Sequence, residues 1–169
     1  MAISMHSASV PVFVRMLKNM LAWLDKAEAH AVAKKFDPKN YLGLRLTPDM
    51  LPFSRQIQIS SDTVKNCLAR LAGLEAPKWE DNEASLDELR ARIRKTIEYA
   101  QSVPAAKIDG SEAREILVPQ GPGRTVPFKG EAMLKHLALP NFFFHAMMTY
   151  ALLRQGGVEL GKADYLGAP

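Results

Sequence analysis

The sequence predicts an all-α protein, a four-helix bundle with a small β-hairpin inserted before its last helix. Three observations support this fold class. Apolar residues recur at helical spacing in four long stretches, the period changes between about residues 114 and 139, and capping or helix-ending residues mark three of the stretches. Helices long enough to pack along one another bury their apolar faces most economically in a bundle.

The first helix is expected from about residue 7 to residue 32. Its inward row recurs at helical spacing and consists of Val10, Val14, Leu17, Leu21 and Leu24. Pro11 falls in the first turns, where a proline is tolerated. The stretch that follows, FDPKNYLGLRLTPDM, is interrupted by prolines and a glycine, so we expect an extended connection there.

The second helix is expected from about Pro52 to Ala72, and Gly73 ends it. Its inward row includes Ser60, and Gln56 flanks that row near its beginning. Two polar side chains therefore lie at or beside a buried stripe.

The third helix has the clearest start signal in the chain. Ser85 and Glu88 form a capping box in the sequence SLDE, in which each side chain satisfies a backbone N–H of the first turn. Apolar residues from Leu86 to Ala100 continue at helical spacing, and the helix is expected to stop before Pro104.

Between about Arg114 and Leu139, two extended segments are joined by the glycine-rich stretch QGPGRT, and we expect a β-hairpin there. Within the second segment, AMLKHL is equally compatible with the beginning of a helix. Pro140 biases Leu139 away from the helical region and suits a first turn, so the last helix is expected from about Pro140 to Gln155. The tail VELGKADYLGAP is expected to be irregular.

The last helix, PNFFFHAMMTYALLR, is apolar almost all round, yet it carries Asn141 and His145 one turn apart. Burying such groups costs on the order of a few kcal/mol unless each finds a partner. Thr149 continues the same face, and a polar pocket forms if Gln56 and Ser60 point into that space. The candidate pocket residues are therefore Gln56, Ser60, Asn141, His145 and Thr149. They form either a hydrogen-bonded knot or a binding site.

Composition limits the classes of function. The net charge of +4 is spread over interspersed acids and bases, and the locally basic ELRARIRK lacks interleaved aromatics, so we expect a solvated helix face and no nucleic-acid partner. No apolar run approaches the roughly 18 residues of a membrane span, and the start lacks the order of a secretory signal. Cys67 is the single cysteine and is expected to be a core thiol. We expect one cytoplasmic domain over residues 1–169.

The chain resembles the DinB-like superfamily of helical bundles, and within it an uncharacterised branch known as a domain of unknown function. The likeness covers nearly the whole chain and rests on the bundle order, on PNFFFH after an extended segment, and on the closing GKADYLG. The resemblance implies a homodimer. It also implies a divalent metal held by one histidine from the second helix and an HxxxH pair on the last helix, and some relatives conjugate small thiols.

Carried over to this sequence, the HxxxH register falls on Asn141 and His145, and the second-helix position falls on Gln56. One histidine of three remains. Neutral amide oxygens are poor ligands for zinc or nickel, so we expect a degenerate metal site with no cofactor, although a weak zinc or nickel site that uses His145 stays open.

Two functions follow from these observations. The first is a non-catalytic or small-ligand-binding domain with a polar pocket around His145. The alternative is a metal-dependent transferase or hydrolase that acts on a thiol or a small electrophile, with His145 as the surviving ligand. The sequence leaves enzymatic activity undecided.

Overall fold

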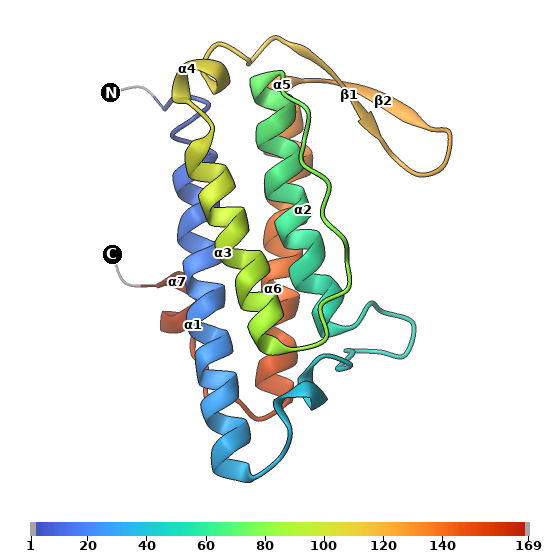
Figure 1. The fold of residues 1–169 in the computed structure, drawn as a ribbon. Coiled ribbons are helices and arrows are strands. Elements are labelled where there is room, and N and C mark those ends of the chain that lie inside the picture. The colour runs from blue at the N-terminus through green and yellow to red at the C-terminus, as the bar shows by residue number, and fades with distance from the viewer. Residues whose placement is uncertain (1–2, 168–169) are drawn as a thin grey trace.

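A computed structural model describes residues 3–167 (Figure 1). Four long helices form its body: α1 (Val10–Lys34), α2 (Phe53–Ala72), α3 (Leu86–Ser102) and α6 (Leu139–Gln155). A two-stranded antiparallel sheet, β1 (Glu115–Pro119) and β2 (Thr125–Lys129), precedes the last of them. The predicted bundle with an inserted hairpin is therefore confirmed.

The helices form a ring in which α1 contacts α3, α3 contacts α2, α2 contacts α6, and α6 contacts α1. In Figure 1, α2 and α3 both run upward, so the segment between them, residues 73–85, returns along the length of the bundle. The bundle thus has one long crossover connection. This arrangement places α2 and α6 side by side, and their contact positions the candidate site.

Four of the shorter elements lie toward the ends of the bundle: η1 (Pro38–Tyr41), α4 (Ala105–Ile108), α5 (Gly130–Met133) and the π-helical segment η2 (Leu134–Ala138). The fifth, α7 (Lys162–Leu166), lies beside the middle of α1 (Figure 1). The hairpin register pairs Glu115 with Lys129 and Pro119 with Thr125.

The core lies along the bundle axis and is filled by apolar side chains from all four long helices. Phe13 of α1 meets Phe142 of α6 edge to face, with ring centroids 5.0 Å apart. Both rings are fully buried. Phe143 is half-buried and Phe144 is 52% exposed, so the helix that looks apolar all round buries only one ring of its Phe triplet completely.

Local signals set several boundaries as expected. Gly73 ends α2 in the left-handed region, with φ of 67°. The Ser85 hydroxyl accepts a hydrogen bond from the backbone N–H of Glu88, and the Glu88 carboxylate accepts one from the N–H of Ala84. Helix α1 begins and ends two to three residues later than expected.

The last helix begins at Leu139, one residue from its expected start, but Pro140 does not mark a break in helical structure as expected. Helical structure runs from Gly130 through α5 and the π-helical segment into α6, and Leu139 adopts helical angles directly before the proline. Pro140 has no backbone N–H to donate. The i to i+5 hydrogen-bond pattern of the π segment lets the helix continue without that donor. The alternative that AMLKHL begins a helix is therefore correct.

The tail is also more ordered than expected, because α7 docks on α1. The Trp23 indole N–H donates to the carbonyl of Asp164 at 2.9 Å, and the Tyr165 ring stacks on Trp23 at 5.6 Å. Lys26 pairs with the Asp164 carboxylate at 2.6 Å. Aromatic stacking and hydrogen bonds to α1 thus turn the GKADYLG segment into a helix.

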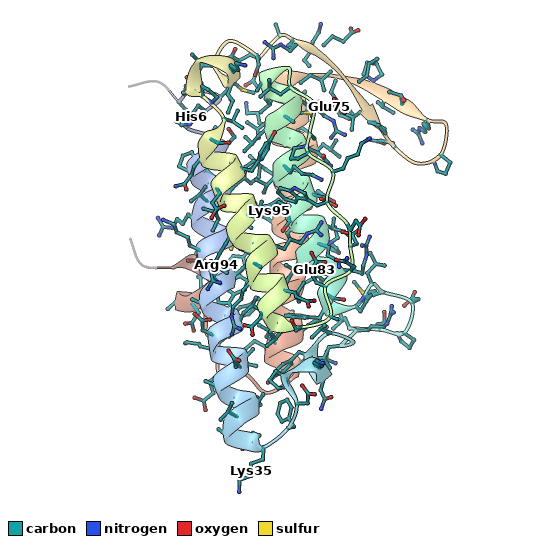
Figure 2. The ribbon with its side chains drawn as sticks, in the orientation of Figure 1. His6, Lys35, Glu75, Glu83, Arg94 and Lys95 are labelled. Carbon is teal, nitrogen blue, oxygen red and sulfur yellow. The ribbon has the colours of Figure 1, made fainter. Side chains whose placement is uncertain are left out.

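The basic stretch of α3 is not a uniformly solvated face. Arg90 is buried and pairs with Asp25 and Glu28 of α1, whereas Arg94 lies on the outward side of the helix (Figure 2). No helix among residues 3–167 combines the length and hydropathy that crossing a membrane requires.

Candidate functional site

His145 and Gln56 meet in the interior between α6 and α2. The Nδ1 atom of His145 lies 2.7 Å from Oε1 of Gln56, and the Gln56 amide Nε2 donates to the carbonyl of Leu51 at 2.9 Å. With its amide nitrogen used in this way, Gln56 offers its oxygen to the imidazole. His145 therefore donates through Nδ1–H, and the unprotonated nitrogen of the neutral ring is Nε2.

Burial sets the charge state of this imidazole. His145 is 8% exposed, and burial lowers its pKa below the ordinary value of 6.5. The neutral ring is thus favoured near physiological pH. A neutral ring suits a single hydrogen bond to an amide oxygen, and burial is the cause of the lowered pKa, with no contribution from a carboxylate among residues 3–167.

Ser60 and Thr149 are fully buried but serve their own helices. The Ser60 hydroxyl donates to the carbonyl of Gln56 at 2.8 Å, and the Thr149 hydroxyl donates to the carbonyl of His145 at 2.9 Å. Each bond joins residues four positions apart in one helix. Both hydroxyls thus donate their hydrogen bonds within their own helices and offer little to a ligand.

Asn141 does not join the His145–Gln56 pair. Its Nδ2 amide donates to the hydroxyl of Thr63 at 2.7 Å, and that hydroxyl donates to the carbonyl of Ile59 at 2.7 Å. The expected convergence of Gln56, Asn141 and His145 on one point therefore divides into two separate hydrogen-bonded contacts between α2 and α6.

These residues do not fit a divalent metal. Two ligand atoms about 2.1 Å from a tetrahedral ion lie about 3.4 Å apart, whereas His145 Nδ1 and Gln56 Oε1 are in direct hydrogen-bond contact at 2.7 Å. The side-chain amide nitrogen of Asn141 is already hydrogen-bonded to the hydroxyl of Thr63. Among residues 3–167, no group of three histidine, cysteine or carboxylate side chains is placed to hold an ion.

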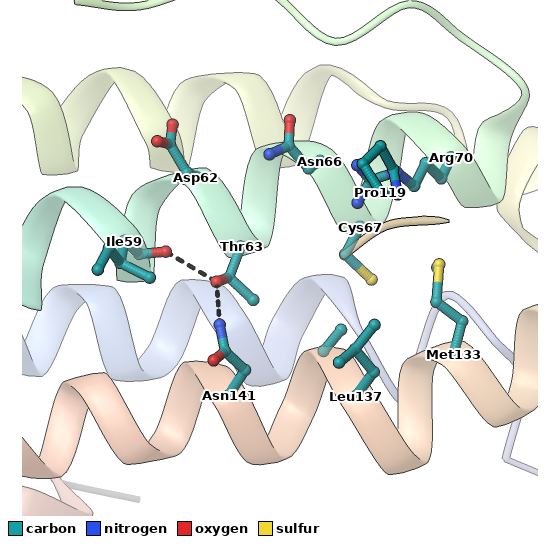
Figure 3. A pocket seen from close by; sticks show the side chains of 11 residues that line it. Ile59, Asp62, Thr63, Asn66, Cys67, Arg70, Pro119, Met133, Leu137 and Asn141 are labelled. Carbon is teal, nitrogen blue, oxygen red and sulfur yellow. Dashed lines mark hydrogen bonds between the residues drawn. The ribbon is translucent and has the colours of Figure 1, made fainter. Parts of the chain in front are cut away.

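A groove of about 310 Å³ opens beside Asn141, between α2, the helical segment that leads into α6, and the end of β1. Figure 3 shows Asn141 and Thr63 meeting across it, with Arg70 and Pro119 toward the other end. Cys67, Met133 and Leu137 supply apolar wall between these ends. The volume is at the lower end of the range for small-molecule pockets.

Four polar residues of this groove were not among the predicted site residues: Asp62, Thr63, Asn66 and Arg70. The spacing of three and four residues places Thr63, Asn66 and Arg70 along one side of α2, and that spacing was the available signal. Within the described residues, the side chains of Asn66 and Arg70 make no hydrogen bond or ion pair. The groove therefore carries unused hydrogen-bonding capacity.

Cys67 is buried, as expected for a core thiol. Burial raises its pKa to about 12, so the thiol stays protonated at neutral pH and is a poor nucleophile. Of the remaining histidines, His30 contacts the Tyr41 hydroxyl at 2.6 Å and His136 is exposed on the π-helical segment. Neither lines the groove.

Comparison with known proteins places these features in a family. The model of a domain of unknown function, DUF1993, matches residues 5–166. The crystal structure of a DinB family member from Shewanella denitrificans is similar over 97% of this chain and 92% of the other, with 40% sequence identity and a TM-score of 0.87. No curated protein matches the sequence.

Proposed function

Because the chain belongs to the DUF1993 domain family and to the DinB-like superfamily, we propose that it is a small-ligand-binding bundle in which a hydrogen-bonded pair replaces the metal site. The observation that carries this proposal is the α2–α6 groove, which places Thr63, Asn66 and Asn141 around a space of about 310 Å³. The protein acts by binding and not by metal-dependent catalysis. We also propose that residues 1–169 form a single domain and that the protein is cytoplasmic.

The bound molecule has a polar group at the Asn141 end of the groove and is apolar along part of its length. Asn141 uses its NH₂ group on Thr63, which leaves its carbonyl oxygen as an acceptor, and Asn66 offers both amide functions. Met133 and Leu137 supply apolar contact beside them. A primary amide on a short alkyl chain matches this lining, because it donates to Asn141 and accepts from Asn66.

Titration with hexanamide, followed by ¹H–¹⁵N NMR of the backbone amides, tests this proposal. We expect the shifted resonances to gather at residues 63–70 and 133–141. Asn141→Leu weakens the binding, whereas Asn40→Leu, at an exposed position of η1, leaves it unchanged. Shifts scattered over all helices, or none at the groove, would contradict a ligand site between α2 and α6.

The competing function, a metal-dependent transferase or hydrolase, makes a different prediction about metal content. We expect protein purified without an affinity tag to contain far less than one equivalent of zinc, nickel or iron, because no group of three histidine, cysteine or carboxylate side chains among residues 3–167 is placed to hold an ion. Near-stoichiometric metal that disappears in His145→Ala would instead support the enzyme.

We also propose a homodimer, as the family resemblance implies. Phe144 and Met147 lie one turn apart on the outer side of α6 and are 52% and 47% exposed. Two large apolar side chains on one exposed helix face suit an isologous contact, in which the same face meets its copy.

A further inference from the structure

The charge of Arg70 is the unexplained feature of the groove. The buried Arg90 and Arg92 each contact several carboxylates, and the buried Lys65 pairs with Asp62 at 2.9 Å. Arg70 is half-buried, lines the groove, and has no carboxylate partner among residues 3–167. A guanidinium stays charged at neutral pH and presents five N–H donors, so its donors here remain free for another molecule.

Nothing in the groove neutralises this charge. Asp62 also lines the groove, but it pairs with Lys65 and with Arg92 at 3.1 Å, and it lies eight residues, or about 12 Å, along the helix from Arg70. Cys67 is protonated, because burial raises its pKa to about 12. Burial also lowers the pKa of Arg70 itself, as expected for a cation that has lost water without gaining a counter-ion.

The backbone carbonyls at the C-terminal end of α2 do not offset the charge of Arg70 either. A side-chain nitrogen of Arg114 donates to the carbonyl of Leu71, so a second guanidinium already serves the carbonyls at this end of the helix. The C-terminal end of α2 beside the groove therefore carries two guanidinium groups, those of Arg70 and Arg114.

The two ends of the groove are separated by a fixed distance. Thr63 and Arg70 are seven residues apart on α2, which corresponds to about 10 Å along the helix axis. The wall between them includes Cys67, Met133 and Leu137 and is apolar. A molecule that fills the groove needs an anionic head at one end, a short apolar middle, and a hydrogen-bonding group at the other end.

Resting on the proposed function, we infer that the ligand of this groove is an elongated small acid whose carboxylate or phosphate binds the Arg70 guanidinium. The planar fork of an arginine matches the paired oxygens of either group. Asn66 lies one turn from Arg70 on the same helix and supplies an amide donor. Asn141 and Thr63 then contact the far end of the molecule.

Three probes that share one carbon chain test this inference on the full chain: hexanoate, hexyl phosphate and the neutral hexanamide. We expect at least one of the two anions to bind roughly ten-fold more tightly than hexanamide, because hydrogen bonds to charged groups exceed neutral ones in strength. The tighter anion identifies the head group. The side-chain Nε–Hε resonance of Arg70 in ¹H–¹⁵N spectra should shift with the anion and not with the amide.

Arg70→Gln should reduce the affinity for the anion to that for hexanamide. Arg94→Gln removes the same charge from an exposed position of α3 and should leave both affinities unchanged. Arg70→Lys retains the charge and provides the folded comparison if Arg70→Gln loses structure.

The outcomes separate this inference from the proposed function. If hexanamide shifts the groove amides and neither anion binds more tightly, the groove binds ligands but Arg70 does not select acids, and the inference fails alone. If none of the three probes shifts the groove amides, both fail. Anion binding that persists in Arg70→Gln also overturns the inference.

Discussion

His145 and Gln56 form a contact in which each residue fixes the other. The Leu51 carbonyl accepts from the Gln56 amide, the Gln56 oxygen accepts from His145, and the imidazole is thereby held in one tautomer. The hydrogen bond joins residues 89 positions apart in the chain and links α2 to α6 through buried atoms. The two side chains thus act as a structural link between α2 and α6.

Replacing His145 should measure the strength of this link. In His145→Leu the Gln56 oxygen loses its donor inside the protein, so we expect the free energy of unfolding to fall by about 1 to 3 kcal/mol. Urea unfolding measures it. Adding Gln56→Leu should recover part of the loss, because removing both polar partners costs less than removing one. A single variant as stable as the wild type would mean that the bond contributes nothing.

The pH dependence of stability provides an independent test of the same imidazole. Burial lowers the pKa of folded His145 below 6.5, so the unfolded chain binds the proton more readily and protonation favours unfolding. We expect full stability above about pH 6.5 and a progressive loss as the pH falls from there toward the folded-state pKa. Urea midpoints over this range should show a smaller slope for His145→Gln. The exposed His136→Gln is the control, and equal slopes in all three proteins would refute the assignment.

At the scale of elements, the crossover between α2 and α3 is held by a buried cation. The side chain of Arg92 of α3 is 2% exposed and contacts Asp81 and Glu83 of the crossover, each at 2.9 Å. It also pairs with Asp62 of α2. The Trp79 ring lies near Arg92 and Lys65. One guanidinium therefore joins two helices and the long segment that connects them.

Removing Arg92 should loosen this segment. We expect Arg92→Leu to lower the free energy of unfolding by about 3 kcal/mol, because three carboxylates lose a shared partner. Limited proteolysis should then cut residues 73–85 faster, while the rest of the bundle stays resistant. Arg94→Leu, on the exposed face, should change the stability by no more than about 0.5 kcal/mol. An uncut crossover in Arg92→Leu would show that other contacts hold it.

Elements with local signals were predictable, and those fixed by distant contacts were not. The capping box at Ser85 and the glycine at position 73 act within one turn, and α3 and α2 begin and end there. The local rule that a proline disfavours helical angles at the preceding residue does not hold at Pro140, because the π-helical segment before it continues the helix. Helix α7 forms against Trp23, which lies more than 130 residues earlier in the chain. The spacing of apolar residues and the capping signals carry no information about a partner as distant in sequence as Trp23.

At the scale of the whole molecule, the sequence located the α2–α6 interface but not the unpaired charge beside it. Asn141, His145 and Gln56 stand out as polar residues in apolar stripes, and the interface brings His145 to Gln56. Arg70 resembles any surface arginine in sequence. Its significance depends on where carboxylates from other elements lie, and they surround Arg90 and Arg92 instead. Only the assembled bundle distinguishes the three arginines.

The proposed homodimer is a property of the assembled bundle, since it depends on a face that the four-helix ring leaves uncovered. Burying Phe144 and Met147 against their copies removes apolar surface from water, so we expect a concentration-dependent dimer in sedimentation equilibrium. Phe144→Glu and Met147→Glu should each yield a monomer, because a buried unpaired carboxylate opposes its own copy across the symmetry axis. Leu117→Glu introduces the same charge at a 63% exposed position of the hairpin and should leave the dimer intact. A wild-type protein that remains monomeric at all concentrations, or a dimer insensitive to both α6 variants, would contradict a homodimer that pairs through this face.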